Sequence, residues 1–100
     1  MKVIQITDHN GNGGVNSFVY DLCESQIKLG NEVMFVSIID YKNRATKEGL
    51  EQIEKAGVKL CCLGALNKPD AILHYIGKLR RIIKDFAGDE SCICNLHLKL

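Results

Sequence analysis

Residues 32–39 read EVMFVSII, a nearly unbroken apolar run with the length of one β-strand. A strand with one face in water would alternate apolar and polar residues, and this run does not. Strands covered on both faces have such runs, and they are typical of parallel sheets with helices packed on either side. The stretch therefore predicts an α/β fold built on a parallel sheet.

Strand and helix patterns alternate on both sides of this run. The predicted strands are residues 2–7, 32–39, 58–63 and 92–98, and the predicted helices are residues 15–29, 44–56 and 67–87. The order βαβαβαβ implies right-handed crossovers and helices on both faces of the sheet. We therefore expect a Rossmann-like, three-layer α/β/α fold with a parallel sheet of about four strands, in which ligands bind at the carboxyl ends of the strands.

Apolar stripes mark the faces on which the helices are expected to pack. The stripe of the first helix is Val15, Phe18, Val19, Leu22 and Leu29, and that of the third is Ile72, Tyr75, Ile76, Leu79, Ile83 and Phe86. Gly30, Gly57 and Gly88 follow the three helical patterns, as glycines at helix C-terminal ends do. Gly49 interrupts the second helical pattern and weakens its prediction.

The composition is that of one globular domain over residues 1–100. Hydrophobic residues make up 46% and charged residues 25%, and the net charge is +1. A nearly neutral chain has no overall field that would attract nucleic acid, so we expect no nucleic-acid partner. No apolar run reaches the roughly 18 residues that span a bilayer, and no signal peptide opens the chain. A cytoplasmic location is expected.

The chain stops directly after the fourth predicted strand, with no helix to cover it. We therefore expect an incomplete part of a longer protein. An exposed strand pairs readily with another strand, so a homodimer of this fragment through that strand is also expected.

Five cysteines, an odd number without an export signal, indicate a reduced protein rather than a disulfide framework. Cys61 and Cys62 point to opposite faces of a strand and cannot easily share one ion, whereas Cys92 and Cys94 share a face. Free cysteine behaves as a small buried hydrophobe, so we interpret these residues as core packing. No metal site and no other cofactor are expected.

Three glycines, Gly11, Gly13 and Gly14, lie between the first strand and the first helix. Glycines let the backbone approach a ligand closely, and the N-terminus of the following helix offers free N–H groups to an anion. The loop suits phosphate, carboxylate or sugar hydroxyls. The simpler interpretation is a turn that needs glycine only for its backbone angles.

A dinucleotide-binding fingerprint is nearly present in the same loop. Gly11 and Gly13 match its first two glycines, Asn16 stands in place of the third, and Asp40 follows the second strand where a ribose-binding acid would lie. The fingerprint should follow its strand directly, whereas Asp8, His9 and Asn10 are expected to intervene. A dinucleotide-binding oxidoreductase domain is one alternative, and a non-catalytic interaction domain is another.

A family resemblance covers nearly the whole chain. It rests on Gly13, Gly14 and Val15, then on Phe18, Val19 and Leu22, and then on residues 29–33 (LGNEV). This pattern resembles the start of the family-four retaining glycosyltransferases, which have the GT-B fold of two Rossmann-like domains. Asn31 replaces the histidine of their G-H-E-V motif, and Cys23 replaces an alanine. Residues 92–97 (CICNLH) are similar to their fourth-strand pattern D-I-I-H-x-H, with His97 at the second histidine and Asn95 at the first.

The resemblance implies the N-terminal, acceptor-side domain of an enzyme that transfers a sugar from a nucleotide-sugar donor to a glycan or lipid-linked acceptor, with retention of configuration. It implies that Asn12, Gly13, Gly14 and Val15 contact the donor phosphates and that His97 acts as a catalytic residue in the same cleft. Most donor contacts of the family come from a C-terminal domain that these 100 residues do not contain. That domain is the expected partner, and the chain alone is expected to be inactive.

Four cations lie within seven residues of the third predicted helix: Lys78, Arg80, Arg81 and Lys84. An ordinary solvated face is the simpler interpretation. The alternative is peripheral contact with anionic lipid headgroups at the inner face of the membrane, as suits an enzyme with a lipid-linked acceptor. His74, on the same predicted helix, is interpreted as structural.

Overall fold

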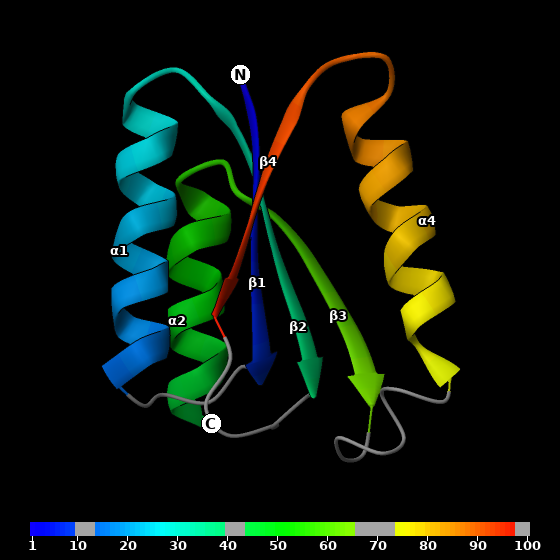
Figure 1. Ribbon diagram of the computed structural model, residues 1–100. Helices are drawn as coiled ribbons and strands as arrows, with labels where there is room; N and C mark the ends of the chain where they lie inside the picture. Colours follow the sequence, from blue (N-terminus) through cyan, green and yellow to red (C-terminus); the bar gives the residue numbers. More distant parts are fainter. Residues whose placement is uncertain (10–13, 40–43, 66–73, 98–100) are drawn as a thin grey trace.

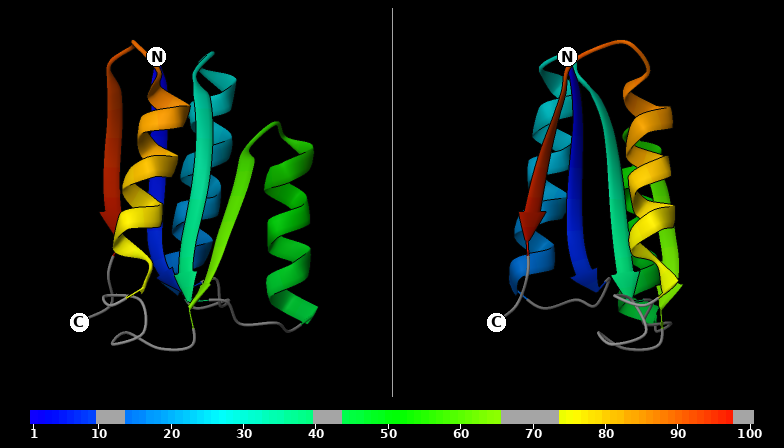
Figure 2. Two further views of the ribbon diagram at one scale, coloured as in Figure 1. Left: turned by 90° about the vertical axis from the view of Figure 1, so that its right-hand side faces the viewer. Right: turned by 45° about the vertical axis from the view of Figure 1, so that its right-hand side comes forward.

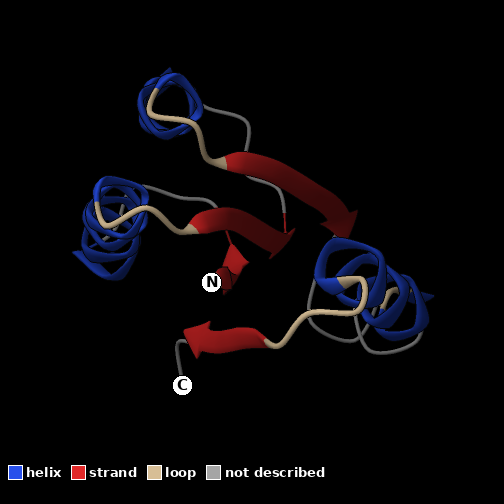
Figure 3. Cartoon of the chain, turned by 90° about the horizontal axis from the view of Figure 1, so that it is seen from above, coloured by secondary structure: helices blue, strands red, loops and turns tan. Residues whose placement is uncertain are grey.

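The computed structural model describes residues 1–9, 14–39, 44–65 and 74–97. A four-stranded, all-parallel sheet separates α1 and α2 on one face from α4 on the other (Figures 1 and 3). The strands are β1 (Lys2–His9), β2 (Glu32–Ile39), β3 (Lys59–Ala65) and β4 (Cys92–His97), and the helices are α1 (Gly14–Lys28), α2 (Arg44–Lys55) and α4 (Ile76–Ala87). The predicted Rossmann-like, three-layer α/β fold is confirmed.

The strand order is β3-β2-β1-β4, so β1 and β2 are central and β4 lies at an edge. All four strands point the same way, so their carboxyl ends lie together at one end of the sheet (Figure 2). We call this end the carboxyl edge, as distinct from the edge strands β3 and β4. In β4, Ile93 and Leu96 are exposed. The edge position agrees with the sequence analysis, and the homodimer expected through this strand stays a prediction.

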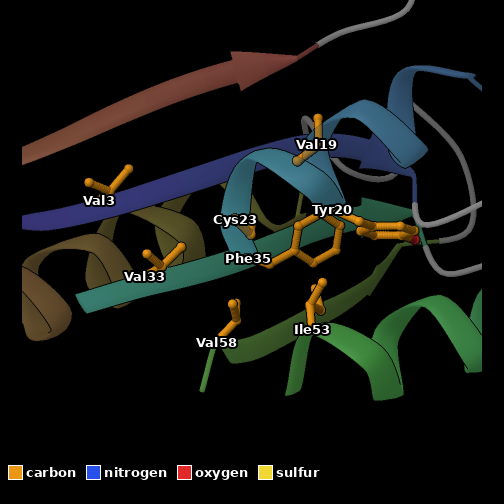
Figure 4. Close-up of a cluster of buried hydrophobic side chains, with 8 residues drawn as sticks. All are labelled: Val3, Val19, Tyr20, Cys23, Val33, Phe35, Ile53 and Val58. Carbon is orange, nitrogen blue, oxygen red and sulfur yellow. The ribbon is translucent and has the colours of Figure 1, made fainter. Parts of the chain in front are cut away.

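The run that predicted the fold is buried on both faces, as expected. Val33 and Phe35 of β2 belong to a core cluster beneath α1 and α2, which Figure 4 shows. Met34 and Val36 belong to a second cluster on the other face, against which α4 packs. The four side chains are at most 2% exposed. Burial on both faces explains why this strand lacks the alternating pattern of a half-exposed one.

Several predicted boundaries differ from the structure, and β3 ends at Ala65, two residues beyond its predicted end. β1 continues through Asp8 to His9, beyond the predicted end, because His9 still pairs with Ile39 of the neighbouring strand. The predicted third helix began near Asn67, and its first part falls in residues 66–73, which lie outside the described residues. Its C-terminal end at Ala87 is confirmed.

The helix faces were predicted only in part. Phe18 is 61% exposed and Leu29, beyond the end of α1, is 79% exposed, so neither belongs to the core. Val19 is in the core as predicted, and it meets the sheet together with Cys23 and Tyr20, which the stripe did not include. Val19 and Cys23 are four residues apart and therefore lie one above the other on the helix. Ile76 of α4 is likewise exposed, and other apolar residues of that helix take its place.

The side chain of Lys2 joins the start of the chain to the end of α4. Its Nζ donates a hydrogen bond of 2.8 Å to the carbonyl oxygen of Phe86 and lies 5.6 Å from the centroid of the Phe86 ring. A cation at the carbonyl end of a helix stabilises the negative end of the helix dipole. Lys2 thereby fastens α4 to β1 at the end of the sheet opposite the carboxyl edge.

Close packing against Tyr20 explains why α2 has a glycine at position 49. A Cβ placed there would lie 2.7 Å from Cε2 of Tyr20, whose ring is tilted against Phe35 in the core. Gly49→Ala should therefore lower the free energy of unfolding by about 1–3 kcal/mol, although alanine is the better helix former. Urea denaturation of the two proteins measures this difference.

Gly77 of α4 is the matched control, because a Cβ there would meet nothing within 4 Å. Gly77→Ala should raise the free energy of unfolding by up to about 0.5–1 kcal/mol. Two alanine variants with the same sign would contradict the packing explanation for Gly49.

Candidate functional site

The carboxyl edge of the sheet brings together the ends of β1, β2 and β4. Thr7 of β1 pairs in register with His97 of β4 on one side and with Ser37 of β2 on the other. Helix α1 begins at Gly14, and four residues, 10–13, separate it from the end of β1. The predicted histidine and the N-terminus of the first helix therefore belong to neighbouring strands at one edge.

His97 packs against the first half of α1. Its imidazole and the Phe18 ring have centroids 6.5 Å apart and an interplanar angle of 69°, an edge-to-face arrangement. This geometry is favourable for two rings. Phe18, predicted as a core residue, is instead an exposed residue that contacts the candidate histidine, so α1 helps to set the direction of the imidazole.

A buried glutamine holds the other side of His97. Nε2 of His97 lies 2.7 Å from Oε1 of Gln5, and Nε2 of Gln5 donates a hydrogen bond of 2.9 Å to Oε1 of Gln26 in α1. Gln5 is fully buried. Gln5 was not among the predicted site residues. A glutamine inside the apolar strand KVIQIT is nevertheless a signal, since a buried amide requires hydrogen-bond partners.

Further polar side chains lie beside one another on β1, β2 and β3, near the carboxyl edge. Thr7 and Ser37 are fully buried, and Cys62 of β3 pairs in register with Ser37 and is exposed. Ser37 Oγ has no hydrogen-bond partner among the described residues. Burial, and then the nearby Cys62 and Cys23, raise the pKa of Tyr20 to about 12, so its phenol stays neutral at physiological pH. The hydroxyl groups of Thr7, Ser37 and Tyr20 are therefore neutral hydrogen-bonding groups.

The predicted phosphate-binding residues are only partly within the structure. Gly14 and Val15 are the first two residues of α1, where backbone N–H groups have no partner within the helix. Asn12 and Gly13 lie outside the described residues. Of the predicted phosphate site, the structure therefore describes the N-terminus of α1.

The basic residues of α4 lie on the other face of the sheet from His97. Lys78, Arg80, Arg81 and Lys84 are all exposed, which agrees with the solvated face expected for these cations. Lys78 Nζ also lies 5.8 Å from the centroid of the Tyr75 ring. Of the helices the structure describes, none has the length and apolarity to cross a bilayer.

The cysteines were predicted as core residues, and this holds for only some of them. Cys23 is fully buried, Cys61 and Cys92 are half-buried against the second core cluster, and Cys62 and Cys94 are exposed. The prediction was wrong for Cys62 and Cys94 because β3 and β4 are the edge strands, whose faces are incompletely covered. The described residues contain no group of three or more histidine, cysteine or acidic side chains that could hold a metal ion.

These exposures predict a large spread of thiol reactivity. Burial, with a smaller effect of Glu24, raises the pKa of Cys23 to about 12, which suppresses the reactive thiolate. At pH 8 an aromatic disulfide reagent should modify Cys62 and Cys94 first and Cys23 at least about 10²-fold more slowly. Peptide mapping after timed quenching measures this order. Rapid modification of Cys23 in the folded protein would contradict it, and unfolding in urea should abolish the difference.

Comparison with family models, with curated proteins and with solved structures gives no match to this chain.

Proposed function

We propose that this chain is the N-terminal, acceptor-side domain of a retaining glycosyltransferase similar to family four. The observation that supports it best is the position of His97. It ends β4 beside β1 and packs against Phe18, within five residues of the start of α1. The histidine and the helix N-terminus thus share the carboxyl edge, where ligands of parallel α/β sheets bind.

The proposed chemistry divides between these two elements. During transfer, the bond from the anomeric carbon to the diphosphate oxygen breaks, a bond to an acceptor hydroxyl oxygen forms with the same configuration, and the hydroxyl proton passes to the departing diphosphate. Negative charge develops on the departing diphosphate, and the positive end of the α1 dipole at Gly14 would stabilise it. His97 would hydrogen-bond the donor sugar. The diphosphate belongs to the substrate, and the proposal requires no resident metal or cofactor.

The test is a sugar-transfer assay on this domain joined to the donor-binding domain that the proposal requires, with a panel of radiolabelled nucleotide sugars. His97→Ala should lower kcat/KM by about 10²-fold, as expected for a lost hydrogen bond to reacting groups. His74→Ala, on the opposite side of the sheet, should leave it unchanged. Absence of transfer from every donor, or full activity of His97→Ala, would overturn the proposal.

The second candidate function is dinucleotide binding, and one observation favours it. Because β1 extends to His9 and pairs there with Ile39, only Asn10 separates the described strand from Gly11, and Asp40 directly follows β2. The expected three-residue separation was therefore too long. Calorimetric titration of the chain with NAD and with UDP-glucose distinguishes the candidates, since the dinucleotide domain should bind NAD more tightly.

A peripheral position at the inner, cytoplasmic face of the membrane is part of the proposal, and it predicts a salt-sensitive interaction of α4. Each exposed basic side chain near an anionic surface is worth about 1 kcal/mol. Replacing Arg80 and Arg81 together by glutamine should therefore weaken binding to phosphatidylglycerol vesicles by about 30-fold at low salt. Vesicle co-sedimentation measures the change. Lys28 and Lys55, exposed on α1 and α2, are the matched pair, and an equal loss on replacing them would contradict a role for α4.

A further inference from the structure

The hydrogen-bond chain from Gln26 through Gln5 to His97 has a direction. Gln5 uses its amide nitrogen toward Gln26, where it donates to Oε1. Its carbonyl oxygen Oε1 therefore faces His97 at 2.7 Å. A carbonyl oxygen can only accept, so the imidazole nitrogen on the other side of this contact, Nε2, must carry the proton.

We infer that Gln5 is a positioning residue that holds neutral His97 as the Nε2–H tautomer and leaves Nδ1 as the unprotonated nitrogen. The opposite tautomer would set the lone pair of Nε2 against the lone pairs of Oε1. Gln5 is fully buried in β1, one of the two central strands, so water cannot replace the lost bond. A tenfold change in the tautomer ratio corresponds to about 1.4 kcal/mol, which lies within the range of about 1–3 kcal/mol for a buried acceptor left without a donor.

The surroundings of His97 restrict rotation of the ring as well as its proton. The edge-to-face contact with Phe18 lies on the α1 side, and Gln26 belongs to the last turns of the same helix. One helix therefore contacts both the imidazole ring, through Phe18, and the Gln5 amide, through Gln26. The described residues provide no hydrogen-bond partner for Nδ1, which leaves this nitrogen for a ligand.

The consequence for a ligand rests on the proposed function, whereas the tautomer itself does not. An unprotonated Nδ1 accepts a hydrogen bond, so the ligand group facing it must be a donor such as a sugar hydroxyl. A phosphate oxygen, which only accepts, would not pair with it until the imidazole is protonated. Gln5 thus favours contact with the sugar over contact with the diphosphate.

The test is nitrogen–proton correlation NMR of the imidazoles in the intact 100-residue chain, at a pH where their signals no longer change. His97 should show a pyridine-like Nδ1 and a pyrrole-like Nε2, with an Nε2–H to Nδ1–H ratio about tenfold above that of the same histidine in the urea-unfolded chain. A ratio equal to that of the unfolded chain would overturn the inference. So would a majority of Nδ1–H, the result if both amides were reversed. Neither outcome depends on sugar transfer. The NMR experiment can therefore support or overturn the tautomer whether or not the transferase assay succeeds.

Two variants separate a positioning role from a merely structural one. Gln26→Glu replaces the amide by a carboxylate that can only accept, so Gln5 keeps its direction and the tautomer ratio should be retained. Gln5→Leu has a similar size and removes the acceptor, so the ratio should fall to that of the unfolded chain. Methyl signals of the core cluster around Val19 report that each variant is folded. A wild-type ratio in folded Gln5→Leu would contradict the role assigned to Gln5.

Discussion

Replacing Ile53 with alanine should lower the free energy of unfolding by about 2–5 kcal/mol, the range for truncating a fully buried isoleucine. Ile53 is 0% exposed and packs with Val19 and Phe35 between α2 and the sheet. It is the one fully buried side chain in the described part of α2, so the packing of this otherwise polar helix depends on it. Urea denaturation followed by circular dichroism measures the loss.

Ile76 provides the matched substitution, because it is 54% exposed at the start of α4. Ile76→Ala should change the free energy of unfolding by no more than about 0.5 kcal/mol, as surface substitutions do. Similar losses for the two variants would show that the effect arises from helix propensity rather than from burial.

The protein should lose stability steeply as the pH rises from 9 to 12. Burial raises the pKa of Cys23 from 9.0 to about 12 and, with nearby Cys62 and Cys23, raises that of Tyr20 from 10.0 to about 12. The unfolded chain therefore releases these protons first, and the stabilisation present below pH 9 disappears as the pH approaches 12. For Cys23 alone the loss is on the order of 3–4 kcal/mol. Urea midpoints measured at successive pH values check this.

Cys23→Ala separates the two groups. The variant is less stable at every pH because it loses packing. Its stability should fall less steeply than that of the wild type between pH 9 and 10, where Cys61 and Cys92, whose pKa values burial also raises, still contribute, and it should fall further as Tyr20 begins to titrate in the unfolded chain. Parallel curves for the variant and the wild type over that interval would show that the Cys23 thiol does not contribute to the alkaline loss.

Sequence patterns predicted the layers of this fold because a strand that is buried on both faces has a continuous apolar sequence. The run at residues 32–39 could be interpreted without knowing its neighbours, and the glycines after the helices have the positive φ angles that their positions suggested, such as 90° at Gly30 and 106° at Gly57. These features depend on local chemistry. The sequence was therefore sufficient for the order of elements and for the parallel direction of the strands, whose carboxyl ends lie together.

The contacts of the candidate site depend on pairings distant in the chain, and the sequence did not reveal them. Gln5 and His97 are 92 positions apart and meet only because β4 lies beside β1. Phe18 was assigned to the core on its apolar character, yet its position on α1 turns it toward His97 instead. Which side of a helix meets the sheet is decided by close packing, here by the small Cys23, and not by hydrophobicity alone.

Helix α4 differs from its counterparts in having no fully buried residue between Ile76 and Ala87. Regions with little buried apolar contact open at a lower free-energy cost than the whole molecule, and their amide hydrogens exchange with solvent correspondingly sooner. The amides of α4 should thus exchange by a sub-global opening, while those of β1 and β2 wait for global unfolding. Each such opening exposes the apolar face around Met34 to water, and to proteases and other copies of the chain. The contacts of Lys2 with Phe86 stabilise the closed state and so lower the frequency of these openings.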